Sequence, residues 1–136
     1  MAIYRDYIID MIRDFCRVMC ELLFRACISQ QADAAQSAEE RICDLLQLDR
    51  ETALSLSPES LVRMMRLSGV SYSVAAYVAY SLDRLADGWE EMGMQERCDM
   101  RRAQAEAVAA AYDCDLLECP AGLEPFDEEL AKHSGS

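Results

Sequence analysis

A chain of 136 residues with 52% hydrophobic and 28% charged residues is long enough for one domain with a buried core, and its composition is typical of a folded protein. Its 25 acidic and 13 basic residues give a net charge of −12, which repels phosphate backbones and argues against nucleic-acid binding. No apolar run reaches the length of a membrane span, and acidic residues interrupt the N-terminal apolar positions, so we expect no membrane helix and no signal peptide.

The first predicted element is a long helix over residues 1–28. At helical spacing its main apolar stripe comprises Tyr4, Ile8, Met11, Phe15, Met19, Leu22 and Ala26. A second apolar line lies roughly 120° away around the same helix and comprises Ile9, Cys16, Cys20 and Cys27. Apolar surface therefore covers more than half of the circumference. Either this helix runs through the middle of the fold, or its second line meets another copy of the chain.

Short helices are expected across residues 37–68. The first, over about residues 37–47, buries Ala38, Ile42 and Leu45. The sequence Ser57-Pro58-Glu59 is a strong helix start, because serine caps free amides, proline fits the first turn and glutamate favours the positive end. Gly69 is placed to end that helix, and Ser71 is placed to cap the next one.

Residues 71–112 predict an antiparallel helical hairpin with a turn at Gly93. The apolar stripe of the first arm comprises Val74, Val78, Leu82, Leu85, Trp89 and Met92. Asp83, Arg84 and Asp87 fall on the opposite face, which we expect to be solvated.

Two resemblances follow from these residues. Leu82, Leu85–Ala86, Trp89 and Gly93 resemble the first helix and turn of a tetratricopeptide repeat, although Arg102 stands where that repeat prefers an aromatic residue. The opening from Tyr4 to Ile12, with Phe15 and Leu22–Leu23, resembles an uncharacterised family of short all-helical bacterial proteins that end in such a hairpin. The resemblance implies an all-helical fold and brings no established activity.

Beyond residue 112 the helical pattern stops, since Cys119-Pro120-Ala121-Gly122 breaks any helix. Phe126 and Leu130 are expected to anchor a last acidic turn against the bundle. We therefore predict an all-α single domain over residues 1–131, a bundle of five or six helices, with a disordered tail at residues 132–136.

The residues offer little material for catalysis. The only histidine is His133, and no phosphate-binding glycine loop is present, so we expect no enzyme and no cofactor. Paired acids such as Glu39–Glu40 are expected to face solvent. Seven cysteines are an odd number, and we interpret them as buried packing residues in a reducing cytoplasm, with Cys114 and Cys119 the most exposed.

The sequence therefore favours a non-enzymatic, cytoplasmic protein-interaction module that forms a homodimer through its first helix. The expected interaction surface comprises Ile9, Cys16, Cys20, Cys27, Tyr72, Tyr77 and Tyr80. The tyrosines enter this set because an aromatic surface can bind a peptide or helix. The alternative is a helical protein that binds a small ligand or a metal through its cysteines, although no C-x-x-C spacing occurs.

Overall fold

The computed structural model describes the backbone of residues 2–134 and the side chains of residues 7–133. Within this range the chain forms six α-helices, one π-helix and one short 3-10 helix, and it contains no strand. The predicted all-α class and the predicted number of helices are therefore confirmed.

The helices follow the predicted order with some shifted boundaries. They are α1 (Ala2–Leu23), continued by the π-helix η1 (Phe24–Ile28), then α2 (Ala32–Leu46), the 3-10 turn η2 (Ala53–Ser55), α3 (Pro58–Leu67), α4 (Tyr72–Glu91), α5 (Gln95–Tyr112) and α6 (Glu124–Ser134). Helix α2 begins five residues before the predicted Ser37, in an alanine-rich stretch with high helix propensity. Helix α6 includes Lys132 and His133, which the sequence analysis placed in a tail, and residues 135–136 lie outside the described residues.

Helix starts are set by the serine caps that the sequence predicted. The Ser57 hydroxyl accepts a hydrogen bond from the Ser60 amide at 3.2 Å, with Pro58 in the first turn of α3. The Ser71 hydroxyl does the same for the Val74 amide at 3.3 Å and begins α4. Gly93 has a φ of +79° and reverses the chain between α4 and α5, so the antiparallel hairpin is present as predicted.

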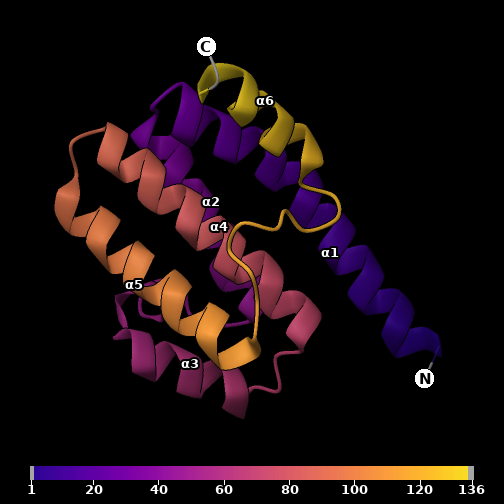
Figure 1. Cartoon of the computed structure of the whole chain (residues 1–136). Helices are drawn as coiled ribbons and strands as arrows, with labels where there is room; N and C mark the ends of the chain where they lie inside the picture. The colour runs from indigo at the N-terminus through magenta and orange to yellow at the C-terminus, as the bar shows by residue number, and fades with distance from the viewer. Residues whose placement is uncertain (1, 135–136) are drawn as a thin grey trace.

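Helix α4 is the centre of the bundle (Figure 1). Helix α5 lies along one side of it, α1, η1 and α2 pack against the other side, and α3 packs on α5. The small side chains of α4 let its neighbours approach: a Cβ added at Gly88 would lie 3.3 Å from both the Ala26 carbonyl oxygen and the Cys27 sulfur. The central position thus belongs to α4, while α1 crosses the outside of the bundle.

Candidate functional site

The residues predicted to form an interaction surface are mostly inside the molecule. Tyr80, Cys16 and Tyr77 are buried, with exposed fractions of 1%, 6% and 9%. Cys20 and Cys27 are half-buried. Only Ile9 and Tyr72 are exposed, at 43% and 68%. The structure therefore does not bring the predicted residues together on one exposed surface of the single chain.

The chain's own C-terminal segment, residues 113–134, covers four of these residues, Cys16, Cys20, Tyr77 and Tyr80. The Tyr77 hydroxyl and the Cys16 thiol both donate to the Ala121 carbonyl, and the Cys20 thiol donates to the Gly122 carbonyl at 3.4 Å. The Tyr80 hydroxyl donates to Asp127 at 2.8 Å. The second apolar line of α1 thus contacts a segment about one hundred residues away in sequence, and needs no other subunit there.

Gly122 makes this close contact possible. Its φ is +105°, and a Cβ at this position would lie 2.7 Å from the Cys16 sulfur. Only a residue without a side chain fits that backbone conformation and that gap. Next to it, Leu123 and Phe126 are buried and fill the space over α1 and α4. Phe126 therefore anchors α6 as the sequence predicted.

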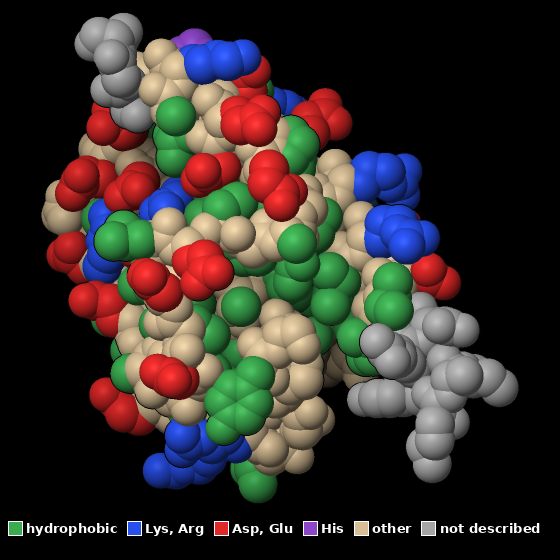
Figure 2. Space-filling model, turned by 45° about the vertical axis from the view of Figure 1, so that its right-hand side comes forward, with side chains coloured by type: hydrophobic (Ala, Val, Ile, Leu, Met, Phe, Trp, Pro, Cys, Tyr) green, Lys and Arg blue, Asp and Glu red, His purple; other side chains and the backbone are tan. Residues whose placement is uncertain are grey.

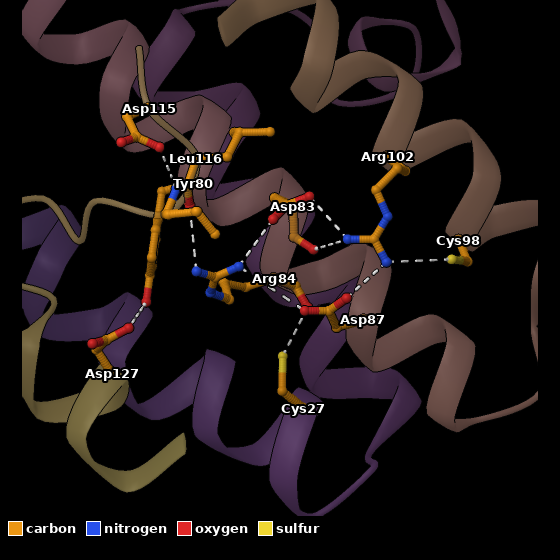
Figure 3. Close-up of polar contacts among 11 residues, drawn as sticks. Cys27, Tyr80, Asp83, Arg84, Asp87, Cys98, Arg102, Asp115, Leu116 and Asp127 are labelled. Carbon is orange, nitrogen blue, oxygen red and sulfur yellow. Dashed lines mark hydrogen bonds and ion pairs between the residues drawn. The ribbon is translucent and has the colours of Figure 1, made fainter. Parts of the chain in front are cut away.

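A charged cluster between α4, α5 and the C-terminal segment was missed by the sequence analysis (Figure 3). Arg102 donates to Asp83 at 2.9 Å and to Asp87 at 2.7 Å, and Arg84 donates to the other Asp83 oxygen at 2.9 Å. Asp83 is buried and the Arg84 side chain is only 12% exposed. The expectation that this face of α4 is solvated is wrong, because α5 supplies an arginine that compensates the buried carboxylate.

Arg84 also links the hairpin to the C-terminal segment. Its guanidinium stacks over the Tyr80 ring at 4.5 Å and donates to the Leu116 carbonyl at 3.3 Å (Figure 3). The Cys27 thiol donates to the Arg84 carbonyl at 3.1 Å, which joins η1 to the same point of α4. These contacts join η1, α4, α5 and the C-terminal segment, so the cluster stabilises the packing of these elements.

A second polar cluster joins the hairpin to α2 and η2. Trp89 donates to Glu39 at 2.8 Å, and Arg101 donates to the same carboxylate oxygen at 2.7 Å. Arg101 and Gln104 also bond the Leu54 carbonyl. Glu39 was expected to face solvent, but its side chain is 14% exposed, because α2 turns it towards the hairpin.

The cysteines behave as packing residues. Burial raises the pKa of Cys16 and Cys43 to about 11 and that of Cys27 to about 12, so these thiols stay protonated at neutral pH. Cys114 and Cys119 are half-buried, and burial raises the pKa of each. No cluster of three or more His, Cys, Asp or Glu side chains able to hold a metal ion occurs among the described residues.

Two of the surface grooves are lined in part by Ile9 and Tyr72, the exposed residues of the predicted interaction surface. The N-terminal groove, of about 530 Å³, lies between the first turns of α1, the end of α2 and the connection from α3 to α4. Its apolar walls come from Ile8, Ile9, Met11, Ile12, Leu45, Leu46, Val70 and Val74. The acidic groove, of about 700 Å³, lies between the first turn of α4 and residues 112–121, with Tyr72, Tyr112, Asp113, Asp115 and Glu118 in its walls.

The fold and these sites define the protein as an all-α helical bundle. None of the helices in the described part of the chain is long and apolar enough to span a membrane. No family model, curated protein or solved structure matches the chain. The hairpin is thus established by its geometry, while its similarity to a tetratricopeptide repeat stays a sequence resemblance.

Proposed function

We propose that this chain is a non-enzymatic, cytoplasmic protein-interaction module that forms a homodimer through the N-terminal half of α1. The observation that carries the proposal is the exposed apolar surface at this end of the molecule. Tyr7 is 55% exposed and Ile9 43% exposed, beside a groove whose walls are mostly apolar. Surfaces of this kind on a folded protein mark sites of association.

The shape of this region favours a second copy as the occupant. The first turns of α1 extend beyond the rest of the bundle (Figure 1), so another molecule can reach them without a clash between the two bundles. The same helix supplies both the exposed side chains, Tyr7 and Ile9, and one wall of the groove. A two-fold arrangement therefore brings each groove against the exposed helix face of the other copy, as an isologous interface requires.

Charge supports the same choice. Residues 1–28 contain four basic and four acidic residues, while residues 29–136 contain nine basic and 21 acidic ones. The whole net charge of −12 thus lies outside this segment. On the face shown in Figure 2, acidic side chains are spread over the left and upper parts, and hydrophobic side chains gather at the centre and right. Two copies that meet through α1 avoid the repulsion that other faces would impose.

Sedimentation velocity on the wild-type chain and two matched variants tests the proposal. Ile9→Glu adds one charge at the proposed interface, and Met100→Glu adds the same charge on α5 at a similar exposure, 39% against 43%. We expect a wild-type dimer, a monomeric Ile9→Glu variant with unchanged helical circular dichroism, and a dimeric Met100→Glu variant.

Two results would contradict the proposal. One is a wild-type chain that stays monomeric up to about 100 µM, where a contact worth roughly 5.5 kcal/mol would be half populated. The other is a Met100→Glu variant that dissociates as completely as Ile9→Glu, because the interface would then not be at α1.

A further inference from the structure

The surface between α3 and α5 carries a groove that the proposed dimer does not use. This α3–α5 groove has a volume of about 610 Å³. Its walls come from Glu59, Val62, Arg63, Arg66, Leu67, Ala107, Ala110 and Ala111. Helix α5 contributes only alanine side chains to it, which leaves room beside α3 for the side chains of another molecule. None of the lining residues lies on α1 or lines the N-terminal groove.

Two arginines without carboxylate partners border this groove. Arg63 and Arg66 lie one helical turn apart on α3, and both are exposed. Neither forms an ion pair with any described side chain, whereas most other described basic side chains pair with a carboxylate. The Arg66 guanidinium donates to the Ala111 carbonyl at 3.4 Å, which holds it over the groove and leaves its other N–H donors available.

The charge of the groove is opposite to that of the molecule. Glu59 carries the only carboxylate among the lining residues, so the walls hold two positive charges against one negative charge. The whole chain has a net charge of −12. An acidic partner is therefore repelled by most of the surface and attracted to the part that contains Arg63 and Arg66.

The apolar side chains of α3 favour a protein as the occupant. Leu67 lines the groove and is 77% exposed, and Met64 on the same helix is 39% exposed. Arginine and methionine are enriched in protein interfaces, in which burial of apolar side chains supplies much of the affinity. Helix α3 has 10 residues and is about 15 Å long, which matches two to three turns of a partner helix laid along it.

We infer that the α3–α5 groove binds an acidic amphipathic helix of a partner protein. The apolar face of that helix covers Leu67 and the alanines of α5, and its carboxylates pair with Arg63 and Arg66. The guanidinium group suits this role because its planar fork of N–H donors matches the two oxygens of a carboxylate. A nucleic acid fits less well, since its many phosphates meet the net charge of −12 and its backbone makes no use of Leu67.

Fluorescence anisotropy with a labelled peptide tests this site. The probe is a peptide of about 14 residues with leucines at helical spacing and glutamates beside them, and the control is a scrambled peptide of the same composition. We expect saturable binding of the probe to the full chain with a dissociation constant of about 50 µM, weakened by salt, and weaker binding of the control. No saturable binding up to about 1 mM, or equal binding of both peptides, would overturn the inference. Displacement of the probe by about 1 mM inorganic phosphate would also overturn it, because the arginines would then form an anion site.

Charge-reversal variants locate the contact. Arg63→Glu with Arg66→Glu should weaken binding of the acidic peptide by about thirtyfold. The control, Arg41→Glu with Lys132→Glu, changes the net charge equally at two other exposed positions and should weaken it no more than about threefold. A peptide with lysines in place of the glutamates should bind the groove variant more tightly than the control variant. Equal affinities of the two variants for either peptide would overturn the inference, because only net charge would then matter.

Leucine variants test the apolar part of the contact. Leu67→Ala and Leu117→Ala remove the same atoms from side chains that are 77% and 85% exposed, so neither should lower the melting temperature. We expect about a fivefold loss of peptide affinity for Leu67→Ala and none for Leu117→Ala. Unchanged affinity of Leu67→Ala would overturn the inference, because the peptide would then not lie in the groove.

The Ile9→Glu variant separates this inference from the proposed dimer. Because no residue of the α3–α5 groove lies on α1, this variant should bind the acidic peptide as tightly as the wild type, whether or not the wild type is a dimer. Loss of peptide binding in Ile9→Glu would overturn the placement of the site between α3 and α5.

Discussion

The two halves of α1 carry the same apolar line but have different surroundings. In the second half, Cys16 and Cys20 lie under residues 121–122, and α6 continues alongside until His133 meets Phe24, with ring centroids 6.3 Å apart. In the first half, Ile9 continues the line beyond the covered part and is exposed. The same apolar line is therefore buried in one half of the helix and exposed in the other. The difference arises because the C-terminal segment, residues 113–134, lies over only the second half.

The largest expected effect comes from removing the anchor of the covered half. Phe126→Ala empties a site that is 1% exposed, and we expect the free energy of unfolding to fall by about 3–5 kcal/mol. Tyr7→Ala, in the uncovered half, should change it by no more than about 0.5 kcal/mol at concentrations that favour monomers. Urea titrations followed by circular dichroism measure both. A loss below about 1 kcal/mol for Phe126→Ala would mean that the C-terminal segment is not held against α1.

Arg84→Met tests how the covering segment is attached to the hairpin. It keeps most of the apolar stem but removes the bonds to Asp83 and Leu116. Because Arg102 still compensates Asp83, we expect a loss of about 2–3 kcal/mol rather than the full cost of an unpaired buried charge. Arg13→Met, which breaks only an exposed pair with Asp10 in the uncovered half, should leave the urea midpoint close to wild type. Equal effects of the two changes would remove the distinction between the covered and uncovered halves.

Alkaline pH should destabilise the fold in part through the covered half. Burial raises the pKa of Cys16 from 9.0 to about 11 and that of Tyr77 from 10.0 to about 12. Because the folded pKa exceeds the unfolded one, the stabilisation is complete below pH 9 and is lost as the pH rises towards 11–12. The loss is about 1.4 kcal/mol per pH unit for each group that ionises only on unfolding. Urea midpoints between pH 8 and about pH 10.5 measure this loss of stability. The Cys16→Ala variant should lose stability less steeply as the pH rises. If its stability falls as steeply as that of the wild type, Cys16 is not buried.

Most of the fold could be predicted from local signals, because helix caps and apolar stripes act within a few residues. Ser57, Ser71, Gly93 and Phe126 all lie where the sequence placed their roles. The failures concern groups whose environment depends on distant residues. Asp83 is buried because Arg102 reaches it from the next helix, and Cys16 is buried because Ala121 lies over it.

One signal for the charged cluster was present in the sequence. Arg102 replaces the aromatic residue that a tetratricopeptide-like hairpin would place there, and Asp83 and Asp87 stand four residues apart on the facing helix. In an antiparallel hairpin these three residues come close to one another. The structure shows this as two ion pairs, Arg102–Asp83 and Arg102–Asp87. A mismatch with a resemblance was therefore more informative about this site than the matches were.

The smallest effect is the one that best separates the two halves of α1. Ile9→Ala removes more carbon atoms than Cys16→Ala, yet Ile9 is exposed and alanine has the higher helix propensity, so the monomer should lose almost no stability. In a dimer that buries Ile9, the same change should lower the melting temperature at high protein concentration and leave it unchanged at low concentration. Cys16→Ala should cost stability equally at all concentrations, because the Cys16 contact with Ala121 lies within one chain. A concentration-independent effect of Ile9→Ala would place Ile9 outside any interface, whereas the predicted dependence would show that the uncovered half of α1 is completed by a second copy.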